Sequence, residues 1–342
     1  MRYKLLGKSG LRVSELCLGT MTFGEDWGWG ADKATSQKIF DHFVGAGGNF
    51  IDTSNNYTNG TSEKFVGEFI QAERDRFIVA TKYTLRVKPD NPQDANLGGN
   101  SRKSMHRSVE NSLRRLATDY IDVLYLHMWD YMTPVEEVLR AVDDLIRAGK
   151  VLYFAFSDTP AWVVSYAIAK AEDYGWSRPI AMQIPYSLLD RSVERDILPM
   201  ARTHDLAICP WGLLEGGVLA GKHRDSTEES RRVSQPGEKE LAAADVLLKI
   251  AAENGCSAAQ VAINWVRQQP GIMIPILGCR REAQILDNLG ALNFRLTDDH
   301  MAELNKLANF QPGFPGSFLH SDHVRGLIFG ETYAQIDQHR PS

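Results

Sequence analysis

The chain has 342 residues, which fits one large α/β barrel as well as two average domains. Its 38 Lys and Arg residues against 43 Asp and Glu residues give a net charge of −5 without a long basic run, so we expect no nucleic-acid partner. No apolar run is long enough to cross a bilayer, and the N-terminus lacks a secretory signal pattern. We therefore expect a cytoplasmic protein without a membrane partner.

Two short apolar runs within residues 3–18 flank a glycine-containing turn and predict a hairpin. Strand-like runs then alternate with segments of helical apolar spacing, at 14–18, 48–51, 77–81, 121–126, 150–156, 180–184, 206–210 and 272–276. Eight such units predict a single-domain α/β chain over 1–342, a (β/α)8 TIM barrel with its core at about 14–308. A doubly wound open sheet is the alternative, but residues 18–24 lack the GxGxxG turn that it would normally carry.

Three connections, 19–31, 83–100 and 211–237, are long and irregular. They follow the first, third and seventh strand-like runs, so in a barrel they rise from the carboxyl ends of the strands, where active sites are built. The last stretch, 309–342, is rich in Phe, Gly, Pro and His and predicts a tail packed over one end.

Polar residues suited to proton transfer follow three successive strand-like runs. Asp52, Lys82 and His127 come directly after the second, third and fourth runs, and Tyr57 lies five residues beyond Asp52. Each alone would often be a surface or core residue. Because neighbouring barrel strands open at the same mouth, the combination predicts one catalytic pocket.

These residues lie in segments that resemble the aldo-keto reductases, barrels with an Asp, Tyr, Lys and His tetrad. The matching segments are DTSNNY at 52–57, ATK at 80–82 and DVLYLH at 122–127, and the resemblance extends from the hairpin to about residue 308. It is strongest to the branch of the aryl-alcohol dehydrogenases and the potassium-channel β subunits. The resemblance implies a metal-free, NADPH-dependent, reversible reduction of small aldehydes or ketones to alcohols by hydride transfer.

The resemblance also implies a role for each tetrad residue. Tyr57 would be the general acid in reduction and the base in oxidation. Lys82 would make the phenol more acidic, and Asp52 would hold Lys82 charged and in place. His127 would hydrogen-bond the substrate oxygen and stabilise its developing charge.

The second half of the chain resembles the cofactor site of that family. The implied NADP(H) contacts are Ser157, Gln183, Trp211, Gly212, Leu214, Gly216, Lys222, Gly278, Arg280, Gln284 and Asn288. Gln183 would bond the nicotinamide carboxamide, Trp211 would stack on the ring, and Arg280 would pair with the 2′-phosphate. The chain departs from the family pattern at Asp158, where Asn is usual, and at Gly212, where Ser is usual.

Aromatic residues near the predicted mouth would suit an apolar or aromatic carbonyl substrate, although loop packing explains them equally well: Phe23, Trp27, Trp29 and Trp129. The oligomeric state stays open. One alternative function is a cofactor-sensing regulatory subunit resembling the potassium-channel β subunits, with little turnover. Another is a barrel enzyme for a phosphorylated substrate, which would leave residues such as Gln183 and Asn288 unexplained.

Overall fold

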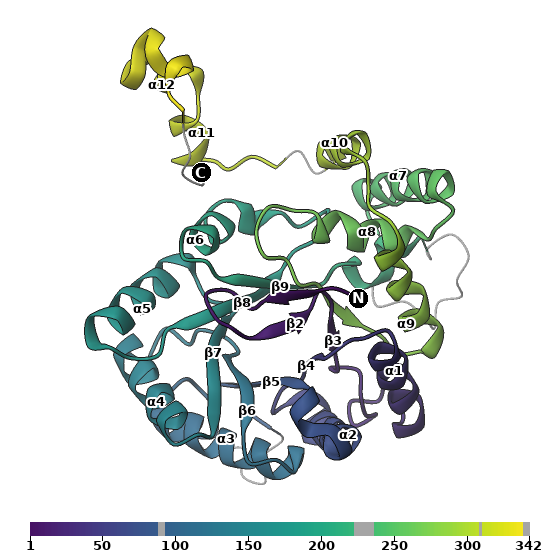
Figure 1. Cartoon of the computed structure of the whole chain (residues 1–342), viewed down its shortest axis with the longest axis vertical. Coiled ribbons are helices and arrows are strands. Elements are labelled where there is room, and N and C mark those ends of the chain that lie inside the picture. The colour runs from purple at the N-terminus through teal and green to yellow at the C-terminus, as the bar shows by residue number, and fades with distance from the viewer. Residues whose placement is uncertain (88–92, 222–235, 308–309, 338–342) are drawn as a thin grey trace.

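The computed structural model describes residues 1–87, 93–221, 236–307 and 310–337. Eight parallel strands form a barrel (Figure 1), which confirms the predicted fold. In chain order they are β3 (Cys17–Gly19), β4 (Phe50–Asp52), β5 (Ile78–Tyr83), β6 (Ile121–Leu126), β7 (Val151–Ser157), β8 (Pro179–Pro185), β9 (Ala207–Trp211) and β10 (Ile276–Gly278). Each strand from β3 to β8 pairs with the next in the chain, and β10 pairs with β3.

The barrel closes where the segment before β10 meets β9. The amide of Ile208 donates to the carbonyl of Ile272 at 2.8 Å, and the amide of Ile274 donates to the carbonyl of Ile208 at 2.8 Å. The predicted eighth strand at 272–276 is therefore divided: its first part bonds β9, and only the following β10 pairs with β3. Pro275 lies between the two parts, and because it has no N–H it cannot extend one continuous ladder.

Helices surround the barrel, except for α11 and α12, which lie in the C-terminal tail (Figure 1). Their bounds are α1 (Lys33–Gly45), α2 (Thr61–Ile70), α3 (Arg102–Leu116), α4 (Val135–Arg147), α5 (Ala161–Tyr174), α6 (Ile197–Thr203), α7 (Glu238–Asn254), α8 (Ala258–Arg267), α9 (Glu282–Leu289), α10 (Asp298–Leu307), α11 (Gly316–Leu319) and α12 (Asp322–Phe329). Short 3-10 turns are η1 (Tyr57–Gly60), η2 (Gln71–Arg76), η3 (Ser192–Glu194), η4 (Glu215–Ala220), η6 (Gly290–Asn293) and η7 (Gly330–Gln335). None of the helices in the described parts of the chain is long and apolar enough to span a membrane.

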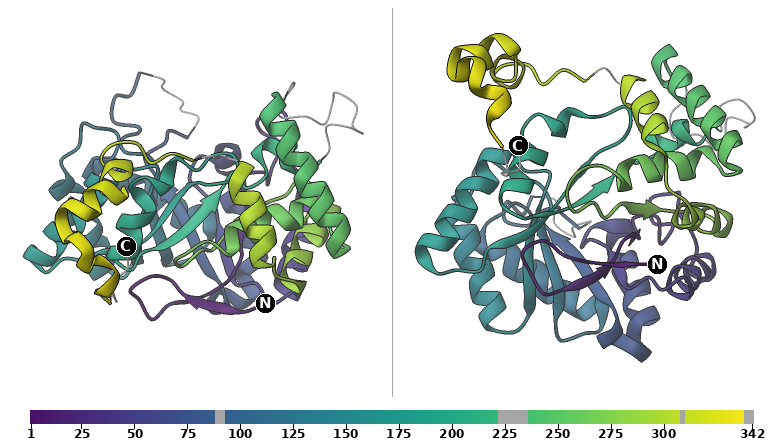
Figure 2. Two further views of the ribbon diagram at one scale, coloured as in Figure 1. Left: turned by 90° about the horizontal axis from the view of Figure 1, so that it is seen from above. Right: turned by 45° about the horizontal axis from the view of Figure 1, so that its top comes forward.

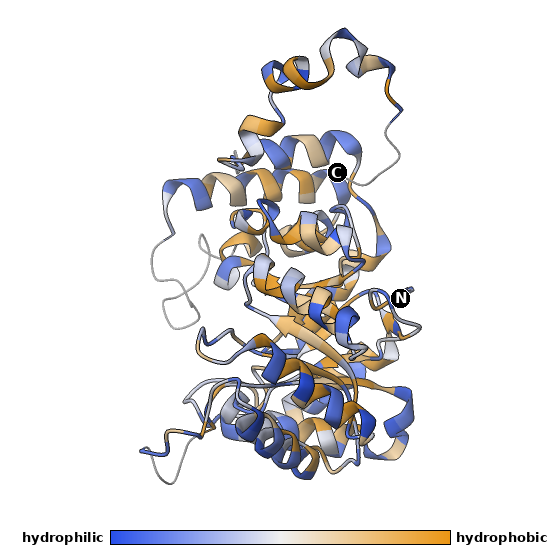
Figure 3. Cartoon of the chain, turned by 90° about the vertical axis from the view of Figure 1, so that its left-hand side faces the viewer, coloured by the Kyte–Doolittle hydropathy of each residue, from blue (hydrophilic) through white to orange (hydrophobic). Residues whose placement is uncertain are grey.

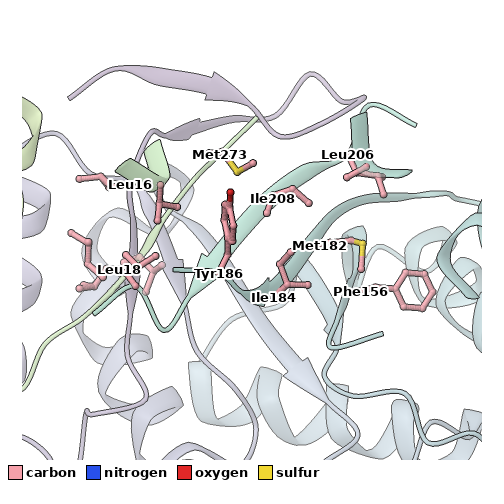
Figure 4. Packing of buried hydrophobic residues seen from close by; sticks show 14 of the residues in the cluster. Leu16, Leu18, Phe156, Met182, Ile184, Tyr186, Leu206, Ile208 and Met273 are labelled. Carbon is pink, nitrogen blue, oxygen red and sulfur yellow. The ribbon is translucent and has the colours of Figure 1, made fainter. Parts of the chain in front are cut away.

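Apolar side chains between the strands and these helices form the larger core. In α1, Asp32 caps the N-terminus by accepting from the amide of Thr35 at 2.7 Å, and the buried face includes Ile39 and Phe43, four residues apart. Figure 4 shows part of the same cluster, with Met182 from β8 near β9. The strands are thus covered on their outer face, as a parallel barrel requires.

A hairpin of β1 (Tyr3–Leu5) and β2 (Arg12–Ser14) lies across one end of the barrel. Leu6 and Val13 are fully buried with the apolar residues of the barrel interior. Gly7 has a φ of +57°, and a Cβ there would lie 2.0 Å from the carbonyl oxygen of Ile180, so only glycine fits this approach. Figure 2 shows the hairpin at the end opposite to the long loops, so the barrel opens toward those loops.

Along the strands, the side chains that face the barrel interior change from apolar to polar toward the open end. In four strands an apolar interior residue is followed two positions later by a polar one, in the pairs Phe50/Asp52, Ala80/Lys82, Ala155/Ser157 and Ala181/Gln183. Because strand side chains alternate between faces, both members of each pair face the interior. The polar members form the next layer toward the mouth.

The C-terminal tail lies outside the barrel (Figure 1), and Figure 3 shows apolar residues along it. Phe314 is 83% exposed and Leu327 is 72% exposed. A contact with the rest of the chain is the hydrogen bond from Arg195 Nε to the carbonyl of Pro312, at 2.8 Å. The expectation of a tail packed over one end of the barrel is therefore wrong for its described residues, because their apolar side chains largely face solvent.

Candidate active site

A pocket of about 560 Å³ opens at the carboxyl ends of the strands. Asp52, Tyr57 and His127 line it, and Lys82 is buried behind them. Predicted cofactor residues that also line it are Ser157, Gln183, Trp211, Gly212, Leu214, Gly216, Gly278, Arg280, Gln284 and Asn288. The remaining predicted cofactor residue, Lys222, lies outside the residues that the structure describes.

Lys82 is held by three hydrogen bonds, the number that an ammonium group can donate. Its Nζ atom lies 2.7 Å from Asp52 Oδ2, 2.8 Å from the carbonyl oxygen of Thr53 and 3.0 Å from the phenolic oxygen of Tyr57. The side chain of Lys82 is fully buried. The structure therefore brings together the acid, the base and the phenol that were predicted from separate strands and loops.

The loop that carries Tyr57 is shaped by its next residue, Thr58, which sequence reasoning missed. Thr58 has a φ of +45°, an uncommon conformation for a β-branched residue. Its hydroxyl donates to the carbonyl of Phe23 at 2.6 Å and accepts from the amide of Ser62 at 3.1 Å. These bonds fix the turn between β4 and α2, which places the phenol of Tyr57 over Lys82.

Burial decides the protonation of the phenol. Burial raises the pKa of Tyr57 above its ordinary value, and the Asp52 carboxylate adds to this, while the Lys82 ammonium acts in the opposite direction. We predicted that Lys82 would make Tyr57 more acidic; the ammonium does act that way, but the net pKa shift is upward. Tyr57 is therefore a protonated donor at neutral pH.

The ammonium of Lys82 is kept charged by its partners. Burial alone would lower the pKa of Lys82, but the Asp52 carboxylate and the Tyr57 hydroxyl raise it above its ordinary value. Asp52 is itself fixed on its other oxygen, because Gln183 Nε2 donates to Oδ1 at 2.8 Å. One amide N–H of Gln183, the predicted carboxamide contact, is thus engaged within the protein.

His127 is a neutral imidazole at the wall of the pocket. Burial, together with the Lys82 ammonium, holds the pKa of His127 well below its ordinary value. Its Nδ1 atom lies 3.2 Å from the hydroxyl of Ser54, which leaves Nε2 to face a ligand. Ser54 was not predicted as a site residue, although its place two positions after Asp52 in the strand-end motif was a signal that could have found it.

The loop after β9 contains glycines in backbone conformations that other residues rarely adopt. Gly212 has a φ of +75° and Gly217 a φ of +105°, conformations that a side chain would strain. A serine at Gly212, as in the family pattern, would need a different backbone there. Without a side chain at Gly212, main-chain groups can approach a ligand there, and backbone N–H groups suit phosphate oxygens.

Residues near α9 complete the other end of the pocket. Gln284 Oε1 accepts from the backbone amide of Arg280 at 2.8 Å and from that of Arg281 at 3.1 Å, so it shapes the turn before the helix. Asn288 Nδ2 lies 3.4 Å from Cys279 Sγ. One continuous pocket thus joins the tetrad to the Arg280 side chain, and this donor set fits a ligand with a reactive ring at one end and phosphate at the other.

Residues 15–309 match the sequence model of the Aldo/keto reductase family. The chain belongs to the aldo/keto reductase family. It is similar to the norsolorinic acid reductase stcV of Emericella nidulans, with 38% identity over 318 residues, 91% of this chain and 82% of the relative. It is also similar to the aryl-alcohol dehydrogenase [NADP(+)] of Phanerodontia chrysosporium, with 41% identity over 332 residues, 90% of this chain and 85% of the relative. This aldo-keto reductase is an oxidoreductase that acts on carbonyl groups.

The aromatic residues predicted near the substrate divide into two groups in this aldo-keto reductase. Trp27 lines the pocket. Phe23 is fully buried in the core against Phe69, with ring centroids 6.3 Å apart, so it does not reach a ligand. Trp29 packs on Trp27 at 5.7 Å, and Trp129 packs on the core. Core packing therefore accounts for Phe23, whereas contact of Trp29 and Trp129 with a substrate stays a prediction.

Apolar residues that sequence reasoning did not single out also line the pocket, among them Leu85 after β5 and Met128 after His127. Met128 stands one residue beyond His127 and Leu85 three residues beyond Lys82, where the chain leaves the strand. That position was the signal that could have identified them. With Trp27 they give the pocket an apolar wall close to the tetrad.

Proposed function

We propose that this aldo-keto reductase catalyses the NADP(H)-dependent, reversible conversion of aromatic aldehydes or ketones to alcohols. The observation that carries the proposal is the 3.0 Å hydrogen bond between buried Lys82 and the Tyr57 phenol, inside a pocket that also includes Arg280. The name of the relative from Phanerodontia chrysosporium, an NADP(+) aryl-alcohol dehydrogenase, supports the same cofactor and substrate class.

The tetrad residues have separate roles in the proposed reaction. The bound dinucleotide supplies the hydride that adds to the carbonyl carbon. Tyr57 gives its proton to the carbonyl oxygen, and Lys82 stabilises the phenolate that remains. In alcohol oxidation the proton returns from the alcohol to Tyr57. His127, as a neutral imidazole, donates a hydrogen bond to the same oxygen and stabilises its partial charge.

The other pocket residues would hold the dinucleotide. Trp211 and Gln183 line the same pocket and would contact the nicotinamide, and the backbone after Gly212 can approach the pyrophosphate. The Arg280 guanidinium would pair with the adenosine 2′-phosphate, which favours NADPH over NADH. The apolar wall formed by Trp27, Leu85 and Met128 favours an aromatic substrate over a small polar one.

The proposed function is tested by following NADPH absorbance with a panel of substituted benzaldehydes and with the matching benzyl alcohols and NADP⁺. We expect steady turnover in both directions and a lower KM for aromatic aldehydes than for short aliphatic ones. Tight cofactor binding without turnover of any carbonyl would instead support the regulatory-subunit alternative. Turnover limited to phosphorylated substrates would support the alternative of a barrel enzyme for a phosphorylated substrate.

A further inference from the structure

Asp158 follows directly after β7 and lines the same pocket, close to Gln183. Its backbone amide donates to the carbonyl of Gln183 at 3.1 Å, and its carbonyl accepts from the amide of Trp129 at 3.4 Å. The residue has a φ of +40°, in the left-handed region that Asp and Asn tolerate better than most residues. Its backbone is therefore held in place from the neighbouring strand and the neighbouring loop.

The hydrogen-bonding capacity of the Asp158 carboxyl group is only partly used within the described structure. Oδ1 is buried and has no hydrogen-bond partner among the residues that the structure describes. The side chain of Trp211 donates a hydrogen bond to the carboxyl group. A buried polar atom normally has a partner, so an unpaired oxygen in a pocket wall indicates a group that the bound ligand would face.

Among the residues that the structure describes, the other charges around the pocket leave Asp158 without a compensating cation at the tetrad end. The Lys82 ammonium and the Asp52 carboxylate offset each other at 2.7 Å. Tyr57 is protonated and His127 is neutral, because burial shifts the pKa of each away from its charged form. Two further charged residues line the pocket: Glu215, whose carboxylate accepts from the hydroxyl of Ser187, and Arg280, beside α9.

A single negative charge at this place would act differently on the two redox forms of a nicotinamide dinucleotide. The oxidised nicotinamide ring is a cation and the reduced ring is neutral, whereas the rest of the molecule is the same in both. We propose that the Asp158 carboxylate makes this pocket favour the oxidised cofactor over the reduced one, compared with the amide that the family usually has here. This inference rests on the proposed NADP(H) function.

The charge on Asp158 can be switched by pH. Burial raises the pKa of Asp158 to about 6, against the hydrogen bond from Trp211 and the attraction of Lys82, both of which lower it. The carboxylate form is therefore present above that pKa and is lost as the pH falls through it. The preference for the oxidised cofactor should follow the same course, because His127 stays neutral across this range.

The test is the ratio of two dissociation constants, measured by quenching of tryptophan fluorescence in the full chain. Kd for NADPH divided by Kd for NADP⁺ is compared between wild type and Asp158→Asn at pH 8. Asn keeps the size of the side chain and tolerates the backbone conformation. We expect the ratio to fall about tenfold or more in the variant, as the loss of one charge pair a few ångströms apart in a partly buried site predicts.

A pH series on the wild type is the second measurement and does not depend on the folding of a variant. The ratio should fall between pH 8 and pH 5 in wild type and stay level in Asp158→Asn. The cofactor 2′-phosphate also has a pKa near 6, but it is common to both redox forms and cancels in the ratio. A wild-type ratio that is the same at both pH values would overturn the inference.

Glu215→Gln is the matched control, since it removes a carboxylate from the same pocket, in the loop after β9. It should change both dissociation constants by a similar factor and leave their ratio unchanged. An equal change of the ratio in Glu215→Gln and Asp158→Asn would contradict a role specific to Asp158. A chain that binds neither dinucleotide would refute the proposed function as well. If both dinucleotides bind but the ratio of their dissociation constants changes neither with pH nor in Asp158→Asn, only this inference is refuted.

Discussion

The Nζ atom of Lys82 lies 3.0 Å from the phenolic oxygen of Tyr57, and both side chains are buried. The ammonium is fixed by three oxygen atoms and can neither rotate away nor lose its charge easily. Its field opposes the upward pKa shift that burial imposes on the phenol. The pair thus holds a proton on Tyr57 at neutral pH and stabilises the phenolate once that proton has left.

Asp52→Asn should lower the free energy of unfolding by about 3 kcal/mol or more, because it leaves a buried ammonium without its counter-charge. Asp52 also accepts from Gln183. The amide group of Asn has only one acceptor oxygen, so its N–H₂ group would face the N–H donors of either Lys82 or Gln183. Urea denaturation measures the change. kcat should also fall, because without the Asp52 carboxylate the pKa of Lys82 would be lower and its protonated form less favoured.

The control for this variant is Asp41→Asn on the exposed face of α1, where the carboxylate accepts from Gln37 Nε2 at 2.8 Å. The free energy of unfolding should change by less than about 0.5 kcal/mol there. A comparable loss at both positions would mean that the Asp52–Lys82 pair does not contribute more than a surface contact.

Arg280→Ala should raise KM for NADPH by about tenfold to a hundredfold and leave KM for NADH nearly unchanged. The reason is that only NADPH carries the 2′-phosphate with which this guanidinium would pair. Steady-state rates with each cofactor, at a saturating aldehyde concentration, measure both constants. Arg281→Ala, at the exposed next residue, should change neither KM by more than about twofold. Equal losses with NADPH and NADH in Arg280→Ala would argue against a phosphate contact.

The pH dependence of reduction should follow the raised pKa of Tyr57. The acid form of Tyr57 is the proton donor, and it is fully present below its pKa, so kcat/KM for the aldehyde should stay level up to about pH 10 and fall above it. At the acid end, the lowered pKa of His127 keeps the imidazole neutral well below pH 6.5. Rates at saturating NADPH over this range provide the test, and a fall of kcat/KM centred near pH 7.5 would refute the assignment.

The positions of the tetrad could be predicted because a strand has a period of two residues and a parallel barrel has only one open mouth. Asp52 and Lys82 each stand two positions beyond an apolar interior residue, and this relation is visible in the sequence. The net pKa shift of Tyr57 was not predictable in this way. It depends on the depth of the pocket, which is set by loops rather than by the strand pattern.

The loops also explain the residues that sequence reasoning misplaced. Phe23 lies in the loop after β3, where its carbonyl accepts a hydrogen bond from the Thr58 hydroxyl and its ring is buried in the core. Trp27, only four residues later, lines the pocket. Both are aromatic residues in one loop, so composition could not tell them apart. The division of the eighth strand at Pro275 was visible in principle, because proline cannot donate to a ladder.

The turnover of Tyr57→Phe tests the central claim most directly. This change removes only the phenolic oxygen, so kcat for aldehyde reduction should fall by about a factor of 10² or more, while Kd for NADPH, followed by tryptophan fluorescence, stays within about twofold. Tyr83→Phe is the control, since that buried phenol belongs to the core between barrel and helices, and its loss should leave kcat nearly unchanged. A Tyr57→Phe enzyme that turns over aldehydes at the wild-type rate would contradict the assignment of Tyr57 as the proton donor.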